Sequence, residues 1–164
     1  MQFFQRHPGS QNDPGLERKI AWQAEAARVL AIYDRETGLL APWYVALRCE
    51  EECYRASRFG RPLTLLYVQP GSESDEWAAS AQLADWLLRK MRRSDIGAHL
   101  GHGCFVVLMT ETDLEHAGTV VRRLQWAIPQ AETSLSSYPE DGKTFEELLA
   151  AARERLDSTS QLAA

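Results

Sequence analysis

An unbroken apolar run, LTLLYV at residues 63–68, constrains the fold more than any other feature of the chain. A strand with one face in water alternates apolar and polar side chains, whereas a strand covered on both faces reads as a continuous apolar run. This run is bounded by turn residues, with Gly60 and Pro62 before it and Gly71 after it. It therefore predicts an inner strand of a sheet that other elements cover on both faces.

Further helices and strands are predicted on either side of this strand. Apolar side chains recur at helical spacing in three segments, Pro42 suits the first turn of a further helix, and two β-favouring runs flank a Gly-His-Gly turn. The expected helices are 16–33, 42–58, 75–93, 114–128 and 144–156, and the expected further strands are 96–100, 104–109 and 133–137. In the helix over 75–93, the expected apolar stripe consists of Trp77, Ala81, Ala84, Leu87, Leu88 and Met91.

The order of these elements predicts an α+β fold with a ferredoxin-like core. In such a fold, helices flank a central sheet that contains antiparallel strands. We expect four parts along the chain: a flexible N-terminal tail at 1–15, an N-terminal helix at 16–33, one domain at 34–156 and a C-terminal tail at 157–164.

The composition disfavours several classes of protein. The 164 residues are 45% hydrophobic and 25% charged with a net charge of −5, which is typical of a globular chain and argues against binding to nucleic acid or to anionic membranes. No apolar run approaches the length of a bilayer span, and the N-terminus lacks the apolar core of a signal peptide. We therefore expect no membrane insertion and a cytoplasmic location.

The cysteines predict neither a disulfide framework nor a zinc site. There are three, an odd and low number. Cys49, Cys53 and Cys104, taken with His99 and His102, form no CxxC or HxxxH pair. A catalytic thiol at Cys104 would also need a base and an oxyanion site, and the sequence offers neither. We interpret Cys104 as a half-buried residue next to a turn.

Short blocks follow one another along the chain. They are DRETGL at 34–39, RPLTLL at 61–66, RRSD at 92–95, GHGCFVVL at 101–108, YPEDG at 138–142 and FEELL at 145–149. In order and spacing they resemble the GGDEF domains of diguanylate cyclases, which open with DxLTGL, continue with the frame RxxD-x5-GGDEF-x-V-L and close with a YPxDG turn. The resemblance covers 34–156 and implies the palm-like fold of the nucleotide cyclases.

The resemblance also implies a reaction, for which this chain lacks the signature groups. Active relatives join two GTP molecules into cyclic di-GMP with two metal ions held by carboxylates. Here Gly103 stands where the metal-binding acid belongs, Cys104 replaces the second acid, and the bulkier His102 replaces the second glycine. The degenerate signature consists of Gly101, His102, Gly103, Cys104 and Phe105.

A second part of the catalytic machinery is missing as well. Where the family reads DxDxFK after its first strand, this chain reads QPG at 69–71, and the guanine-recognising block FKxxNDxxGHxxGD is absent. Neither Gln nor Gly can replace an anionic oxygen ligand of Mg²⁺. We interpret the chain as a pseudoenzyme without catalytic residue, metal or cofactor. The alternative is that Glu73, Asp75 or Asp113 supplies metal ligands in a new geometry.

The product-binding, inhibitory site of the family is implied to survive. It is built on the RxxD motif, here Arg92 and Asp95, and on an arginine of the following helix, which ungapped counting places at Arg123. An arginine fork binds a phosphate or the O6/N7 edge of guanine, and a carboxylate accepts guanine N–H groups. The alternative role is structural, because basic residues at a helix C-terminus complement the helix dipole.

These observations predict a receptor in bacterial second-messenger signalling. It is a catalytically inactive GGDEF domain that binds cyclic di-GMP at its RxxD site and regulates a protein partner or a homodimer. The first alternative is a scaffold that keeps the fold for protein contacts and binds no nucleotide, and the second is a residual diguanylate cyclase. The helix at 16–33 packs either on its own domain or on another chain.

Overall fold

The computed structural model describes residues 14–71 and 76–162, and the chain divides into two units. The described part of the first unit, residues 14–31, belongs to helix α1 (Pro14–Ile32), whose Ile20 and Trp22 side chains are exposed. The helix begins two residues before the predicted start, with a proline in its first turn, where no backbone N–H is needed. Residues 1–13 of the predicted tail lie outside the described residues, and residues 14 and 15 belong to α1. No described helix has both the length and the apolar character of a membrane span.

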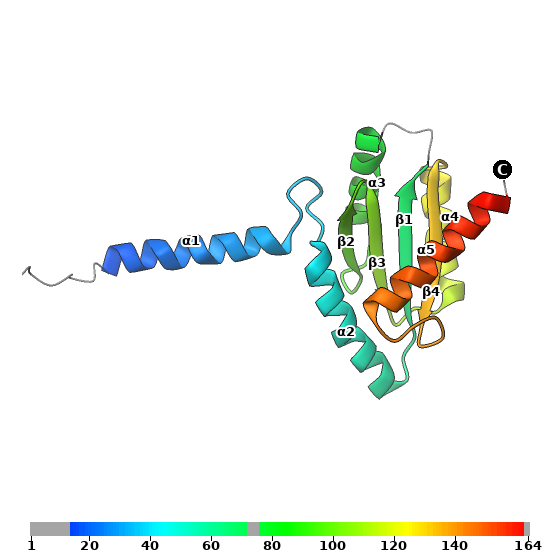
Figure 1. Ribbon diagram of the computed structural model, residues 1–164, viewed down its shortest axis with the longest axis horizontal. Coiled ribbons are helices and arrows are strands. Elements are labelled where there is room, and N and C mark those ends of the chain that lie inside the picture. The colour runs from blue at the N-terminus through cyan, green and yellow to red at the C-terminus, as the bar shows by residue number, and fades with distance from the viewer. Residues whose placement is uncertain (1–13, 72–75, 163–164) are drawn as a thin grey trace, which may run out of the picture. The chain divides into compact units, whose positions relative to one another are not determined.

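The second unit is built on one four-stranded antiparallel sheet (Figure 1). Its strands are β1 (Leu63–Pro70), β2 (Ile96–Gly101), β3 (Cys104–Thr110) and β4 (Ala131–Tyr138), in the spatial order β2-β3-β1-β4. Helix α3 (Glu76–Lys90) connects β1 to β2, and helix α4 (Leu114–Ala127) connects β3 to β4. This is the ferredoxin-like βαββαβ arrangement, and the predicted α+β fold class is confirmed.

Two pairs of helices cover the two faces of the sheet (Figure 1). Helices α2 (Pro42–Phe59) and α5 (Phe145–Leu162) pack with Leu65 and Tyr67 of β1, whereas α3 and α4 pack with Leu66 and Val68 on the opposite face. All six residues of the run at 63–68 are buried. The prediction of an inner strand covered on both faces is therefore confirmed.

Helix α3 turns a different side toward the sheet than the sequence predicts. Within the expected stripe Ala84 and Leu87 are buried, but Trp77 is 69% exposed and Leu88 is 51% exposed. Apolar side chains occur on more than one side of this helix, so their spacing alone cannot decide which side is covered. The buried residues of the helix are Ala79, Leu83, Ala84 and Leu87.

The last helix is longer than predicted. It continues to Leu162, so the described part of the expected C-terminal tail, 157–162, is helical. Leu156 is buried, whereas 157–159 are exposed, and Ser158 Oγ donates to the carbonyl of Glu154 one turn back at 2.8 Å. An exposed extension of this kind carries no apolar periodicity, which is why the sequence pattern misses it.

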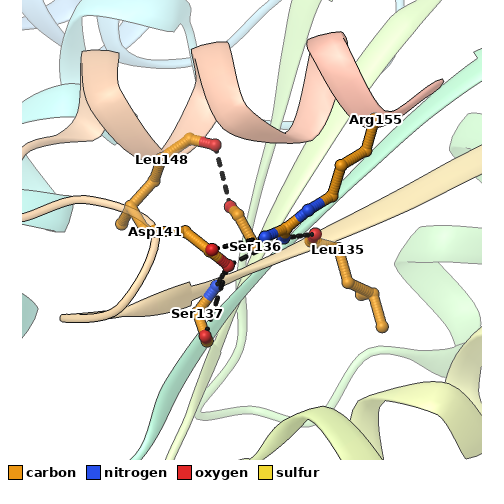
Figure 2. A network of polar contacts seen from close by, with 6 residues as sticks. All are labelled: Leu135, Ser136, Ser137, Asp141, Leu148 and Arg155. Atoms are coloured by element: carbon orange, nitrogen blue, oxygen red, sulfur yellow. Dashed lines mark hydrogen bonds and ion pairs between the residues drawn. The ribbon is translucent and has the colours of Figure 1, made fainter. Parts of the chain in front are cut away.

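A carboxylate in the turn after β4 fastens α5 to the sheet (Figure 2). Asp141 accepts a hydrogen bond from the backbone N–H of Ser137 at 2.8 Å, and it pairs with both terminal nitrogens of Arg155, with Nη1 at 2.7 Å. The bonds from Arg155 hold the pKa of Asp141 below its ordinary value. The YPEDG sequence at 138–142 thus has a structural role.

Two side chains reach backbone carbonyl groups across the same junction (Figure 2). Arg155 Nη1 also donates to the carbonyl oxygen of Leu135 in β4 at 2.6 Å. In the opposite direction, Ser136 Oγ of β4 donates to the carbonyl oxygen of Leu148 in α5 at 2.8 Å. Strand and helix are therefore joined by bonds that each element donates to the other.

Candidate functional site

The turn between β2 and β3 keeps a tight geometry but carries no acidic side chain. Gly101, His102 and Gly103 all have positive φ, of 90°, 50° and 69°. This conformation favours glycine, so His102 is the exception among the three. His102 is exposed, and Cys104 is half-buried with its Sγ 3.6 Å from the carbonyl oxygen of His102.

Phe105 anchors this hairpin in the core. Its side chain is fully buried and lies opposite Val68 of β1. Its ring stacks on the imidazole of His99 with 4.9 Å between the ring centroids. Phe105, the last residue of the segment 101–105, therefore serves packing.

Pro70, the last residue of β1, leaves little room for a side chain at Gly103. A Cβ built at Gly103 would lie 3.0 Å from Cγ and 3.3 Å from Cδ of Pro70, which is tighter than ordinary carbon contacts. The positive φ of Gly103 adds backbone strain for any other residue. An acidic side chain at this position therefore requires Pro70 to move.

Gly71, which follows β1, also has no room for a side chain. A Cβ built at Gly71 would lie 2.5 Å from the backbone oxygen of Gln130. Gln69 Nε2 donates to Glu132 Oε2 at 2.7 Å, and its Oε1 accepts a bond from the Tyr67 hydroxyl at 3.1 Å. The QPG segment thus packs β1 against β4 and the adjoining loop.

Replacing Gly103 by alanine is expected to destabilise the protein by about 2 kcal/mol, because the new Cβ meets Pro70 while the backbone keeps its positive φ. Gly101→Ala is the matched control. Nothing lies within 4 Å of a Cβ there, so only the strain of about 1 kcal/mol remains. Urea unfolding of both variants measures the difference. Equal losses would show that Pro70 does not restrict position 103.

The described residues offer no ready metal centre. Within 14–71 and 76–162, no group of three or more His, Cys, Asp or Glu side chains is placed to hold a metal ion. Asp113, one of the alternative ligands, caps α4 by accepting the backbone N–H of His116 at 2.9 Å. Hydrogen bonds from His116 hold the pKa of Asp113 below its ordinary value. Glu73 and Asp75 lie outside the described residues.

The RxxD segment forms a closed turn between α3 and β2. Asp95 Oδ2 accepts the backbone N–H of Arg92 at 2.8 Å, and the Asp95 N–H donates to the Arg92 carbonyl at 3.1 Å. Burial raises the pKa of Asp95, against the lowering effect of the Arg92 N–H. The second oxygen, Oδ1, is buried without a hydrogen-bond partner in the described part of the chain. The Arg92 side chain is exposed and makes no ion pair there.

The three predicted ligand residues do not line one cavity. Asp95 lines a cavity of about 550 Å³ beside α2, to which Arg93 and Glu52 also contribute. Arg123 lines a separate hollow of about 360 Å³ between α3 and α4. Arg92 lines neither of these two. The RxxD turn at 92–95 and Arg123 of α4 therefore do not contribute to a common cavity among those described.

The hollow that Arg123 lines contains two side chains that sequence reasoning missed, Trp86 of α3 and Trp126 of α4. Lys90 of α3 and Arg122 of α4 lie beside them. The basic residues stand out in the sequence, but the side of the helix on which each tryptophan lies depends on tertiary packing. One signal was available: in each helix a tryptophan and a basic residue are four apart and thus share a helix face.

A second polar turn joins the start of this unit to β2. Asp34 Oδ1 accepts bonds from Thr37 N at 2.9 Å and Thr37 Oγ1 at 2.6 Å, and it lies 3.1 Å from His99 Nδ1. Burial acts to raise the pKa of Asp34, but the bonds from Thr37 and His99 outweigh it and the pKa lies below its ordinary value. Leu40 then pairs with the edge of β2 through its N–H and its carbonyl. The DRETGL block at 34–39 thus builds a structural turn.

Comparison with known proteins shows the fold. No protein-family model matches the chain, and no curated protein matches it by sequence. A sensory box/GGDEF family protein from Caulobacter crescentus is 21% identical with a TM-score of 0.72, over 80% of this chain and 99% of that one. The coiled coil and GGDEF domain of DgcB from the same organism, solved in complex with cyclic di-GMP, is 11% identical with a TM-score of 0.77, over 90% of each chain.

A third solved structure includes a protein partner. The diguanylate cyclase SiaD from Pseudomonas aeruginosa, in complex with its activator SiaC, is 18% identical with a TM-score of 0.72. The likeness covers 90% of this chain and 65% of SiaD. At these identities the comparison establishes the fold, which is that of GGDEF domains.

Proposed function

We propose that this chain is a receptor for cyclic di-GMP that has the GGDEF fold, lacks diguanylate cyclase activity and regulates a protein partner. One observation carries the proposal. The RxxD turn is formed with an exposed Arg92, while packing leaves no room for a side chain at Gly71 and Gly103, two positions at which the family pattern has an acidic residue.

The loss of catalysis is supported by the sterics of these two glycines. Two-metal phosphoryl transfer depends on carboxylates that place the ions with little tolerance. At Gly71 a side chain would meet the backbone oxygen of Gln130, and at Gly103 it would meet Pro70. The surrounding structure has thus adapted to glycine, so the cyclase is not restored by returning the acids alone.

The retention of ligand binding is supported by the two arginines. Arg92 and Arg123 are both exposed, and neither guanidinium makes an ion pair with a carboxylate of the described residues. An unpaired guanidinium can bind a phosphate or the edge of guanine bidentately. DgcB, a structural neighbour, was solved with cyclic di-GMP bound. The same ligand presents two phosphates and two guanines to this pair of arginines.

Calorimetric titration of the full chain with cyclic di-GMP is expected to show saturable binding with a Kd below roughly 100 μM, which corresponds to about −5.5 kcal/mol. Arg92→Ala is expected to weaken binding by about 2 kcal/mol, roughly thirtyfold, because a charge-assisted contact is lost. Arg93→Ala is the matched control, since it removes the same charge one residue away from the motif.

The control separates specific recognition from general attraction of an anion. Equal weakening by Arg92→Ala and Arg93→Ala would point to charge alone and would contradict a site built on RxxD. Absence of saturable binding would overturn the receptor function itself.

Incubation of the protein with GTP and Mg²⁺ or Mn²⁺ is expected to yield no cyclic di-GMP. If cyclic di-GMP forms, and if its formation disappears on replacing Glu73 or Asp75, the chain is a diguanylate cyclase.

A scaffold without nucleotide binding is favoured by one observation. Trp43, Leu47 and Tyr54 are large exposed side chains at helical spacing along one side of α2. SiaD shows that a protein with this fold assembles with a protein partner. The scaffold predicts a dimer or a complex in light scattering together with a flat calorimetric trace for cyclic di-GMP.

A further inference from the structure

Aromatic and cationic side chains meet in the hollow between α3 and α4. Helix α3 contributes Trp86 and Lys90, and helix α4 contributes Arg122, Arg123 and Trp126. Residues four apart lie on the same side of a helix, so each helix presents one indole and one cation there. The hollow measures about 360 Å³, within the size range of small-molecule sites.

The charge of this hollow is of one sign. Among the described residues no Asp or Glu lines it, and Lys90, Arg122 and Arg123 make no ion pair with any of them. Arg122 is held by a single neutral contact, donating to Thr119 Oγ1 at 2.9 Å. Three neighbouring cations repel one another, and all three are exposed. In a chain of net charge −5, they form a local site for an anion.

The two indoles add a preference for a planar ring. Trp126 is 89% exposed, whereas Trp86 is half-buried and packs against the core beneath α3 and α4. An indole left almost entirely in water gains nothing for folding. Aromatic faces bind nucleobases by stacking, and neighbouring arginine and lysine groups bind the phosphates that accompany them.

We propose that this hollow is a purine-binding subsite for cyclic di-GMP, in which Trp126 stacks on one guanine and Lys90 and Arg122 bind the adjacent phosphate. The inference rests on the proposed function, since the ligand is the one assigned there to Arg123. A dinucleotide bound to the Arg123 guanidinium lies beside both indoles, because Arg123 itself lines the hollow. The RxxD turn follows Lys90 at the end of the same helix.

A protein segment could use the same surface, but the nucleotide is favoured. Apart from the two indoles the apolar lining is limited to one alanine, Ala127, which offers little to the aliphatic side chains that anchor protein contacts. The pairing of flat rings with unpaired cations instead matches a ligand made of bases and phosphates.

Titration of the full chain with cyclic di-GMP tests the subsite. Trp126→Ala is expected to raise the Kd about tenfold or more, the amount that loss of one stacked base produces. Trp126→Phe is expected to recover much of the affinity, because it restores an aromatic face. Trp77→Ala is the matched control, since it removes another exposed tryptophan from the opposite end of α3 and is expected to leave the Kd within about twofold.

Tryptophan fluorescence provides a second measurement. Cyclic di-GMP is expected to quench the wild type and Trp77→Ala, and to quench Trp126→Ala less. Wild-type binding that Trp126→Ala leaves unchanged would overturn the subsite while leaving the receptor function intact. Absence of wild-type binding would overturn both. Binding weakened equally by Trp126→Ala and Trp77→Ala would also overturn the subsite, because the effect would then not depend on the hollow.

Discussion

Phe105→Ala is expected to lower the free energy of unfolding by about 3–5 kcal/mol, the largest effect of any single change considered. Phe105 is fully buried in β3, lies opposite Val68 of β1 and stacks on His99 of β2. It therefore connects three strands of a four-stranded sheet. Truncation leaves a cavity that these hydrogen-bonded strands cannot collapse to fill, so the lost contacts are not recovered.

Urea unfolding followed by circular dichroism measures this loss. Phe105→Leu is the matched control, because it keeps an apolar side chain of similar length and is expected to cost less than about 1.5 kcal/mol. A loss below about 1 kcal/mol for Phe105→Ala would contradict the packing described here. It would mean that the hairpin formed by β2 and β3 does not pack into the core.

Asp141→Ala is expected to cost about 3 kcal/mol. The variant removes two contacts of Arg155 and the acceptor for the Ser137 N–H. Hydrogen bonds to charged groups contribute about 1.5–3 kcal/mol, and the upper limit applies because Asp141 accepts bonds from both Arg155, whose side chain is 48% exposed, and the Ser137 N–H. Asp157→Ala, which removes an exposed carboxylate from α5, is the control and is expected to change stability by less than about 0.5 kcal/mol.

The pH dependence of unfolding gives an independent check on Asp141. Its folded pKa lies below the value of about 3.9 in an unfolded chain, since Arg155 stabilises the charged form. Its contribution to stability is therefore complete above that value and is lost as the pH falls through the lowered folded pKa. Asp141→Ala should show a shallower loss of stability below pH 4 than the wild type. Parallel curves for the two proteins would show that Arg155 does not lower this pKa.

The fold could be predicted largely because its strongest patterns are local. The apolar composition of residues 63–68 predicts an inner strand, and the Gly-His-Gly turn predicts a hairpin. The predictions fail where burial depends on tertiary contacts. Helix α3 has apolar residues on several sides, and only the sheet decides that Leu83 faces inward and Trp77 outward. The last turns of α5 are helical without an apolar stripe to reveal them.

The candidate site was predictable to a smaller extent. Linear spacing identifies the RxxD turn, whose hydrogen bonds form within four residues. Spacing cannot show that Asp95 and Arg123 line different cavities, because their positions depend on how α3 and α4 pack. Nor can it reveal that Pro70 fills the space beside Gly103, a contact between residues that are distant along the chain. Hydrogen bonds between residues that are close in the sequence can be predicted from it, whereas cavities lined by distant residues can be identified only in the packed structure.

The pairing of Leu40 with β2 has a consequence for behaviour at high concentration. Strand β2 forms one edge of the sheet, and an edge with free N–H and C=O groups is a template on which a foreign strand can add. Leu40 occupies two of these groups, accepting the N–H of His99 and donating to the carbonyl of Gly97 at 3.0 Å each. The turn at 34–39 holds Leu40 in place and thereby makes this part of the β2 edge unavailable to a strand of another chain, which disfavours aggregation.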